Sequence, residues 1–252
     1  MNFIPDFSNK NIIITGATSG IGWETACRYI AAGGNVIAIG RNTSKGQELE
    51  QYAASEKGTC HFYACDFPIS ETIEPLCARI LAEFPRIDIL VNCAGISIYK
   101  TILEMSIQEW DDIFTTNVKA TFLMCRSILP SMRTNKNGHI VNIGSTAGVC
   151  GAYNLHSYAA TKGAVIQLTR SLAAEYSADN VIINCVCPGA TATNMCKDGE
   201  TPDEMREFLK RFPLGRFATP AEIASIIMFV SSDEASNMAG SIIMDDGGFS
   251  AI

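Results

Sequence analysis

Short β-type apolar runs alternate with longer helical patterns from one end of the chain to the other. The predicted strands are Asn11–Thr15, Asn35–Ile39, Thr59–Ala64, Ile87–Val91, His139–Ile143, Val181–Val186 and Ser241–Met244. The predicted helices between them are Ile21–Ala32, Ser44–Lys57, Ile69–Phe84, Ser106–Arg133, Tyr158–Ser177 and Pro220–Ser231. Strands joined by crossover helices pair in parallel, and helices then cover both faces of the sheet. The sequence therefore predicts an α/β fold with a doubly wound, parallel, seven-stranded sheet.

The segment from Met195 to Phe217 interrupts this alternation. It is a loop with one short predicted helix, Pro202–Phe212, whose apolar face would carry Met205, Phe208, Leu209 and Phe212. Connections this long usually have a function, so we expect a substrate lid at about residues 195–217. A plain surface excursion is the alternative. No proline- or serine-rich linker divides the chain, and we expect a single domain over residues 1–252.

Charge and composition argue against several kinds of partner. The 252 residues carry a net charge of −7, which disfavours nucleic acid, and no run of Lys or Arg points to an anionic membrane surface. No apolar run approaches the ~18 residues of a membrane span, and no secretory signal is evident. Ten cysteines without a C-x-x-C spacing suggest reduced thiols, and the histidines have no metal-ligand spacing with them. We therefore predict a cytoplasmic protein without a metal site.

Tyr158 and Lys162, with Ser145 upstream of them, form a candidate acid–base group. Side chains four residues apart lie on the same face of a helix. A lysine ammonium beside a phenol favours the phenolate and lowers the pKa of the phenol, while the Ser145 hydroxyl would hold a substrate oxygen. The alternative is a surface Tyr–Lys pair on an ordinary helix. The pattern predicts proton transfer to or from an alcohol.

A glycine-rich turn follows the first predicted strand. Residues Thr15 to Gly22 have the spacing G-x-x-x-G-x-G and open the next helix. Glycines let the backbone turn tightly and approach a pyrophosphate, which the helix N-terminus attracts. Such a turn also occurs as a plain connection, but its place between a first strand and a helix indicates a dinucleotide site.

The tip of the second predicted strand bears on which nicotinamide cofactor is bound. An acidic residue there would bind the ribose 2′-hydroxyl of NAD, but the sequence is Ile39-Gly40-Arg41-Asn42. Gly40 leaves room, and Arg41 offers a guanidinium to the 2′-phosphate of NADP, with Lys45 as an additional charge. The alternative is a solvated surface arginine. The sequence therefore predicts NADP(H), with NAD(H) less favoured.

Taken together, these residues resemble the short-chain dehydrogenase/reductase superfamily, and the resemblance covers essentially the whole chain. Six family motifs occur in order: the glycine turn, Asn92-Cys93-Ala94-Gly95 (with Cys93 in place of an asparagine), Asn142-Ile143-Gly144-Ser145, Tyr158-x-x-x-Lys162, Pro188-Gly189 with Thr191 and Thr193, and Asp245-Asp246-Gly247-Gly248. The resemblance implies a Rossmann-type sheet, an NAD(P) cofactor, and reversible hydride transfer between a carbonyl and an alcohol.

The resemblance also implies roles for individual residues. Tyr158 would be the acid/base and Ser145 would orient the substrate oxygen. Lys162 would lower the tyrosine pKa and bind the nicotinamide ribose, and Asn117 would hold a water in the proton relay. The expected cofactor-binding residues are Gly16, Thr18, Ser19, Gly20, Ile21, Gly22, Arg41, Asn42, Asp66, Phe67, Asn92, Ala94, Gly95, Tyr158, Lys162, Pro188, Gly189, Thr191 and Thr193. A cofactor-sensing regulator is disfavoured, because such relatives usually lose the Tyr or the Lys.

Two substrate classes stay open within the family. One is the acyl-carrier substrate of a 3-oxoacyl-carrier-protein reductase of fatty-acid synthesis, but such members tend to place a basic residue before the sixth strand, where this chain has Asp179. The other is a free small molecule, such as a steroid, a sugar or polyol, or another ketone. The expected pocket residues are Ile96, Ile98, Tyr99, Val149, Tyr153 and Leu155. Their apolar character suits an extended alicyclic or acyl substrate.

The resemblance further implies assembly. Helices 106–133 and 158–177 resemble the pair that forms a four-helix dimer interface in the family, and residues 242–252 resemble a second contact. Together these contacts imply a homotetramer with two-fold symmetry. Apolar side chains available for the interface are Phe122, Met124, Leu168 and Leu172. The alternative is that they all face the sheet of their own monomer.

Overall fold

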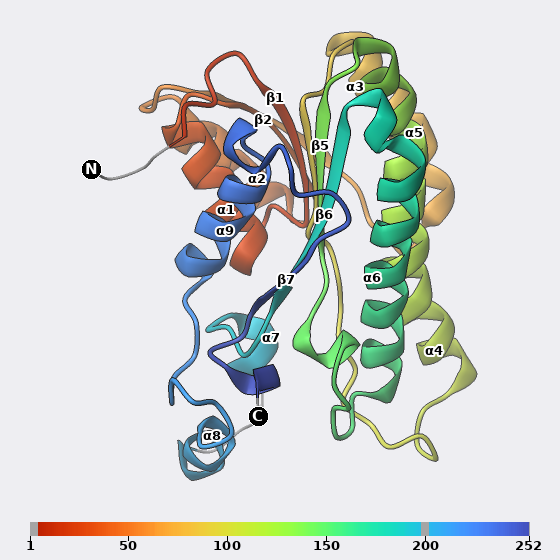
Figure 1. Cartoon of the computed structure of the whole chain (residues 1–252), viewed down its shortest axis with the longest axis vertical. Helices are drawn as coiled ribbons and strands as arrows, with labels where there is room; N and C mark the ends of the chain where they lie inside the picture. Colours follow the sequence, from red (N-terminus) through yellow and green to blue (C-terminus); the bar gives the residue numbers. More distant parts are fainter. Residues whose placement is uncertain (1–4, 198–201, 252) are drawn as a thin grey trace.

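The computed structural model describes residues 5–197 and 202–251, and every structural statement below concerns these residues. Its seven strands form one parallel sheet in the order β3-β2-β1-β4-β5-β6-β7 (Figure 1). The strands are β1 (Asn11–Thr15), β2 (Asn35–Gly40), β3 (Thr59–Ala64), β4 (Ile89–Asn92), β5 (Gly138–Ile143), β6 (Val181–Pro188) and β7 (Ile242–Asp245). The predicted doubly wound sheet is confirmed. The strand order reverses between β1 and β4, and ligands of such sheets bind at the carboxyl ends beside this reversal.

Helices cover both faces of the sheet because successive side chains of each strand point to opposite sides. Ile12 and Ile14 of β1 belong to the buried cluster under α1 (Gly20–Ala31) and α9 (Pro220–Val230), whereas Ile13 belongs to the cluster under α3 (Ile73–Glu83) and α5 (Ala120–Asn135). Figure 1 shows α6 (His156–Tyr176) beside α5 on this second face, and α2 (Thr43–Ala53) on the first. None of the described helices is long and apolar enough to cross a bilayer.

The prediction of one continuous α-helix over residues 106–133 is wrong at its centre. The structure has α4 (Ile107–Phe114), a π-helical turn over Thr115–Lys119, and then α5. The amide of Ala120 donates to the carbonyl of Thr115, five residues back, which is the hydrogen bond of a π turn. Asn117 lies in this wider turn and is buried. The turn therefore places a polar side chain in the interior of the fold.

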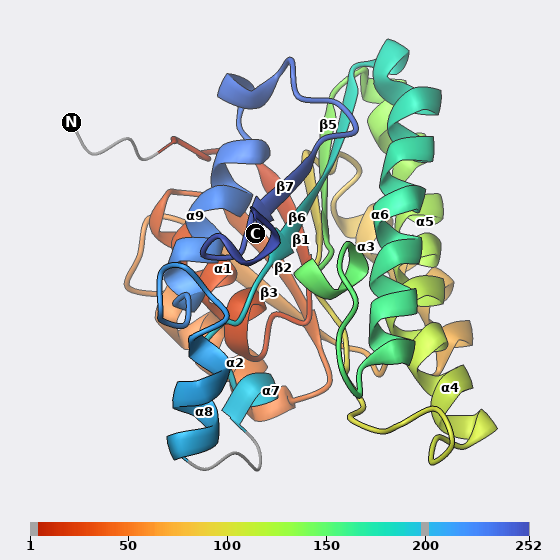
Figure 2. The ribbon, with the colours of Figure 1, turned by 60° about the horizontal axis from the view of Figure 1, so that its bottom comes forward.

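The excursion after β6 holds two short helices, α7 (Asn194–Lys197) and α8 (Pro202–Leu209). Figure 2 shows both helices near each other, on the side of the sheet where the strands end. The helix predicted to reach Phe212 ends at Leu209, and Phe212 packs against Phe208 and Phe249, with ring centroids 5.1 and 4.9 Å away. The side chain of Met205 and residues 198–201 lie outside the described part of the chain.

A buried chain of amides joins three elements beneath the strand ends. Asn92 Nδ2 of β4 donates to Asn142 Oδ1 of β5 at 2.8 Å, and Asn142 Nδ2 donates to Thr169 Oγ1 of α6 at 2.9 Å. Asn142 is fully buried, so its polar atoms depend on these partners. The network fixes α6 to the central strands.

We expect Asn142→Leu to lower the free energy of unfolding by about 2 kcal/mol, because it leaves polar atoms of Asn92 and Thr169 without their buried partner. Urea denaturation measures this change. Asn135→Leu, at the exposed end of α5, is the matched control and should stay within about 0.5 kcal/mol of the native protein. An equal effect of the two substitutions would contradict the role given to the network.

Candidate active site

Ser145, Tyr158 and Lys162 come from two neighbouring elements. Ser145 follows β5, and Tyr158 and Lys162 lie on the first turns of α6. The loop after Ser145 touches the helix backbone, since a Cβ at Gly148 would lie 2.7 Å from the carbonyl carbon of Lys162. Only glycine permits this approach, which holds Ser145 beside Tyr158 at the wall of one cavity.

Lys162 is buried, with 4% of its surface exposed. Its Nζ donates to the carbonyl of Ile143 at 2.7 Å and lies 5.6 Å from the ring centroid of Tyr158. Burial lowers the pKa of Lys162, because desolvation penalises its charged form. An ammonium at this distance favours the phenolate form of Tyr158.

Asn117 holds the loop after β4 against α6. Its Oδ1 accepts from the amide of Ile96 and its Nδ2 donates to the carbonyl of Ile96, both at 2.9 Å. Nδ2 also donates to Thr161 Oγ1 at 3.0 Å, and this hydroxyl donates to the carbonyl of Tyr158. A Cβ at Gly95 would lie 3.3 Å from Asn117 Oδ1 and 3.6 Å from Lys162 Nζ. The structure thus places all four predicted catalytic residues around one site.

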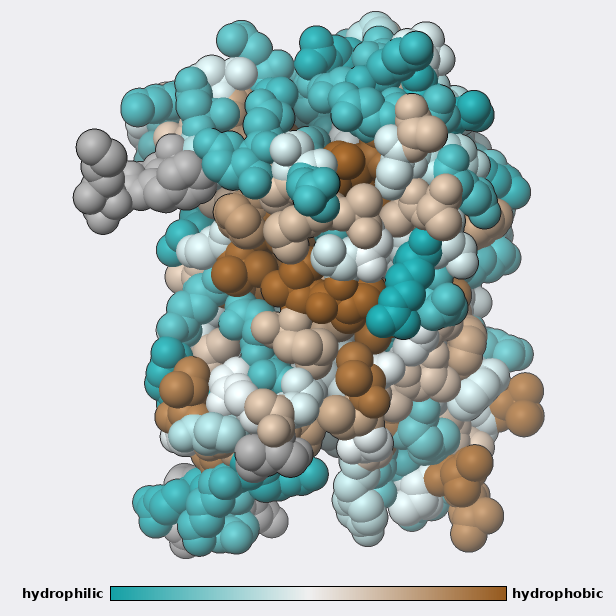
Figure 3. Space-filling view, viewed as in Figure 1, coloured by the Kyte–Doolittle hydropathy of each residue, from teal (hydrophilic) through white to brown (hydrophobic). Residues whose placement is uncertain are grey.

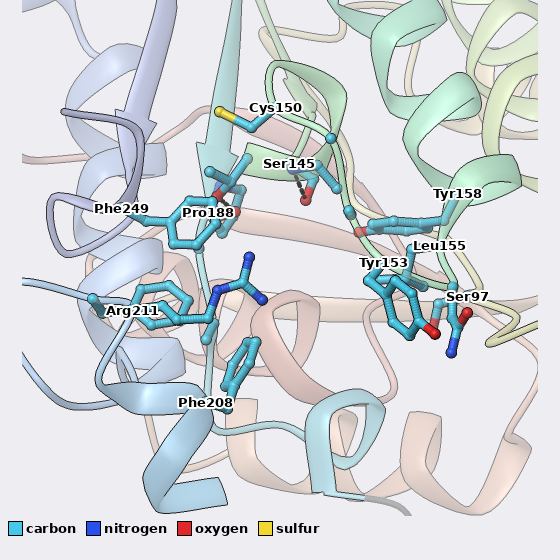
Figure 4. A pocket seen from close by; sticks show the side chains of 18 of the residues that line it. Ser97, Ser145, Cys150, Tyr153, Leu155, Tyr158, Pro188, Phe208, Arg211 and Phe249 are labelled. Atoms are coloured by element: carbon cyan, nitrogen blue, oxygen red, sulfur yellow. Dashed lines mark hydrogen bonds between the residues drawn. The ribbon is translucent and has the colours of Figure 1, made fainter. Parts of the chain in front are cut away.

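The geometry of Ser145 suits a hydrogen bond to a ligand. Its Oγ accepts from the amide of Ala147 at 3.1 Å, which leaves the hydroxyl hydrogen to donate to another oxygen. Ser145 and Tyr158 line the same cavity of about 370 Å³ (Figure 4). A volume of this size holds a small molecule.

The remaining wall of the cavity comes from loops and from the excursion after β6. Of the predicted pocket residues, Tyr99, Tyr153 and Leu155 line the cavity, whereas Ile96, Ile98 and Val149 do not. The excursion contributes Met195, Phe208, Arg211, Phe212 and Phe217. Sequence reasoning missed Cys150, Arg211 and Phe249 as cavity residues, and no local pattern marks them.

The glycine turn after β1 fits an anion. A Cβ at Gly22 would lie 2.3 Å from the carbonyl oxygen of Gly16, and Gly16 itself has φ +70° and touches Ala94. Ser19 caps α1 without a side-chain hydrogen bond, and the first turn has no acidic residue. The amides and the positive end of the helix dipole therefore stay available, as a pyrophosphate requires.

The loop after β4 lies across this turn and is held by the backbone. The amides of Cys93 and Ala94 both donate to Thr15 Oγ1 at 3.0 Å, so the cysteine does not weaken this contact. Burial raises the pKa of the Cys93 thiol to about 11, and the thiol therefore stays neutral near Lys162. Asn92 uses its amide for the network with Asn142.

The loop after β6 approaches the glycine turn from another side. A Cβ at Gly20 would lie 3.1 Å from Thr193 Cγ2, which places Thr193 beside the start of α1. Thr191 is buried and donates to the carbonyl of Gly189 at 3.1 Å. Pro188 and Gly189 line the cavity. This loop therefore extends from the start of α1 to the cavity at Tyr158.

The residues expected at the adenosine end lie after β2 and β3. Arg41 is exposed and forms no ion pair with any residue the structure describes, whereas the Lys45 ammonium pairs with Glu48 at 2.6 Å. Asn42 Oδ1 caps α2 by accepting from the amide of Lys45. A Cβ at Gly40 would lie 2.7 Å from the Thr18 side chain, so this glycine accommodates Thr18 rather than the ligand.

Asp66 and Phe67 follow β3 and differ in exposure. Asp66 is exposed, so its carboxylate is available to a ligand. The Phe67 side chain is buried in the core, which leaves only its backbone for a cofactor contact. Together with the glycine turn, these residues fit a dinucleotide, whose individual contacts stay predictions.

The chain is similar to known proteins over nearly its whole length. A family model described as enoyl-(acyl carrier protein) reductase matches residues 16–250. The 3-oxoacyl-(acyl-carrier-protein) reductase of Thermotoga maritima is 35% identical over 95% of this chain and 97% of its own. The D-threitol dehydrogenase of Mycolicibacterium smegmatis is 33% identical over 95% of this chain and 92% of its own.

A solved structure shows the same fold. It comes from Beutenbergia cavernae, is assigned as an NAD(P)-dependent gluconate 5-dehydrogenase, and contains NADP at low occupancy. It superposes on this chain with a TM-score of 0.94 and 33% sequence identity. The superposition covers 98% of this chain and 99% of the other. The chain belongs to the short-chain dehydrogenase/reductase superfamily, and it is an NAD(P)-dependent oxidoreductase acting on CH–OH or carbonyl groups.

Proposed function

We propose that this protein uses NADP(H) to interconvert a carbonyl and a secondary alcohol on a free small molecule. The observation that carries the proposal is the meeting of Ser145 and Tyr158 at one cavity, with the ammonium of Lys162 buried behind the tyrosine ring. Hydroxyl groups at a cavity wall next to a buried cation suit an oxygen that gains or loses a proton.

Each catalytic residue has a distinct role in this proposal. The bound cofactor supplies or accepts the hydride. Ser145 donates a hydrogen bond to the substrate oxygen, and Tyr158 gives that oxygen its proton during reduction. Lys162 stabilises the resulting phenolate by its charge. Asn117 keeps the loop after β4 in place through Ile96 and is the expected holder of a water in the proton relay.

We expect Tyr158→Phe to lower kcat by at least ~10²-fold with cofactor binding retained, because it removes the transferable proton and keeps the ring. NADPH oxidation with a carbonyl panel and cofactor titration by fluorescence measure the two effects. Tyr176→Phe, at the far end of the same helix, is the control and should keep full activity. Activity of Tyr158→Phe within threefold of the native protein would refute the assignment.

Arg41 supports NADP over NAD. Its guanidinium has no carboxylate partner among the described residues, and no acidic residue stands at the tip of β2 to bind a 2′-hydroxyl. The structural relative with bound NADP adds support from a chain of the same fold. Lys45 contributes less, because Glu48 already neutralises its charge.

Arg41→Asp should lower kcat/KM for NADPH at least tenfold and raise it for NADH, since the carboxylate repels a 2′-phosphate and accepts from ribose hydroxyls. Initial rates with each cofactor measure the ratio. Lys45→Gln is the matched control and should change the ratio less than Arg41→Asp. Equal use of both cofactors by the native protein would make Arg41 an ordinary surface charge.

Reduction of a 3-oxoacyl-carrier-protein is the second candidate, favoured by the name of the Thermotoga relative. Asp179, the acidic residue before β6, argues against this candidate. Its carboxylate accepts a hydrogen bond from Arg133 Nε at 2.7 Å. This exposed ion pair partly balances the charge of Arg133, which makes that arginine less attractive to an acidic carrier. A cavity of about 370 Å³ supports a free small molecule instead. Rates on acyl thioesters against free ketones and keto-sugars separate the two candidates.

We also propose that residues 195–217 act as a lid within a single domain. The support is the contribution of Met195, Phe208, Phe212 and Phe217 to the cavity wall. Closing such a segment excludes water from the reacting groups and strengthens the electrostatic effect of Lys162.

All nine cysteines that the structure describes are free thiols, which supports a reducing, cytoplasmic location.

We propose a homotetramer, and its two expected contacts differ in their support. Met124 is buried in the core of its own monomer, but Phe122 is 42% exposed on the outer side of α5 and Ile107 is 79% exposed at the start of α4. β7 is the free edge of the sheet, and Figure 3 shows apolar side chains gathered over it. Exposed apolar faces of this kind mark interfaces between copies.

Light scattering at micromolar concentration should give four times the 27.2 kDa mass of one chain. Phe122→Asp should reduce the assembly to dimers or monomers, because it places a charge in one of the two interfaces. Lys57→Asp, a charge change at an exposed position after α2 and outside both expected contacts, is the control and should leave the mass unchanged. A single monomeric species of the native protein would refute the tetramer.

A further inference from the structure

Among the described residues that line the cavity, Arg211 is the one with a charged side chain. It follows α8, within the segment proposed as the lid. Figure 4 shows its guanidinium directed into the cavity, with the hydroxyl end of the Tyr158 ring facing the same space from the opposite side. The rest of this wall is aromatic, from Phe208, Phe212 and Phe249.

The charge of Arg211 is not neutralised within the described residues. Its sequence neighbour Lys210 pairs with Glu207, and Arg216 pairs with Glu222, but Arg211 forms no ion pair there. Its guanidinium carbon lies 5.3 Å from the ring centroid of Phe249. A ring against one face of a guanidinium displaces water and leaves the N–H groups free in the plane, where they bind anions.

We propose that Arg211 binds a carboxylate of the substrate, so that the substrate is a short oxo acid or hydroxy acid. This inference rests on the proposed function, because it takes Tyr158 as the group that handles the carbonyl end. With Arg211 and Tyr158 on opposite sides of one small cavity, the two polar ends of the substrate are bound together and its carbon chain contacts the aromatic wall.

The donor set favours a carboxylate over a phosphate. A guanidinium forms two parallel hydrogen bonds with a carboxylate, and one positive charge balances one negative charge. A phosphate ester carries nearly two negative charges and three acceptor oxygens. The described lining offers no second cation to balance it, and a surplus charge beside aromatic rings is unfavourable.

Steady-state kinetics on matched substrates test the inference. The panel is 3-oxobutanoate, 4-oxopentanoate and 5-oxohexanoate, each with its methyl ester, together with dihydroxyacetone phosphate and an acetoacetyl thioester. With NADPH, the native protein should prefer the best acid over its ester by at least tenfold in kcat/KM. Preference for the phosphate or the thioester, with no effect of changing Arg211, would overturn the inference.

Arg211→Gln should lower kcat/KM on the best acid about 100-fold, mainly by raising KM. It should change kcat/KM on the methyl ester less than about threefold. Arg211→Lys keeps the positive charge but lacks the planar guanidinium. Its kcat/KM on the acid should therefore lie between those of the native protein and of Arg211→Gln. Lys210→Gln is the matched control, because that ammonium is paired with Glu207 and does not line the cavity. Equal losses on acid and ester in Arg211→Gln would show a structural role and overturn the inference.

A binding measurement separates this inference from the proposed function. Calorimetry of butanoate added to the protein with NADP⁺ should show binding that Arg211→Gln weakens at least tenfold. Butanoate binding without reduction of any carbonyl would refute the proposed function and keep the anion site. Reduction of neutral ketones without butanoate binding would keep the proposed function and overturn the inference.

Discussion

The site depends on one buried charge, the ammonium of Lys162. Transferring an ammonium out of water is costly, and here the carbonyl of Ile143 at the end of β5 provides a hydrogen bond at 2.7 Å. This contact ties the start of α6 to a central strand. Burial lowers the pKa of Lys162, and because the thiol of nearby Cys93 stays protonated, no thiolate there cancels the positive charge. The ammonium lies 5.6 Å from the centroid of the Tyr158 ring, where its charge favours the phenolate.

Local sequence determined much of the fold and of the site. β1 begins and ends where its apolar run predicted, because a buried parallel strand needs an unbroken run. β3 also has its predicted bounds, although it lies at the edge of the sheet and only Tyr63 of it is buried. Ser145, Tyr158 and Lys162 could be found because they stand directly after a strand or on the first turns of a helix, whereas Asn117 was identified only through the family resemblance. The π turn was not predictable. Residues Thr115–Lys119 contain no glycine or proline, and only the need of Asn117 to reach Ile96 distinguishes this turn from an ordinary helix.

Contacts between distant segments account for what the sequence did not predict. Arg211 and Phe249 meet at the cavity because the end of the excursion packs on the C-terminal turn. The ring centroids of Phe212 and Phe249 lie 4.9 Å apart, and the amide of Leu214 donates to the carbonyl of Gly247 at 3.1 Å. Gly40 was interpreted as space for a phosphate, but its lack of a side chain makes room for Thr18. In both places the relevant neighbour comes from another strand or loop, which no periodic pattern along the chain encodes.

Contacts of individual side chains also explain how a protein with a negative net charge can bind anions. The net charge of −7 repels anions at long range, but salt screens that repulsion over about 8–10 Å. Recognition then depends on cations that are in contact with the ligand and are not already neutralised. Lys45, Arg133 and Arg216 are paired with carboxylates, whereas Arg41 and Arg211 are not paired within the described residues. Other cations, such as Lys57 and Lys136, are also unpaired among the described residues, so a free charge selects Arg41 and Arg211 only together with their places after β2 and at the cavity wall.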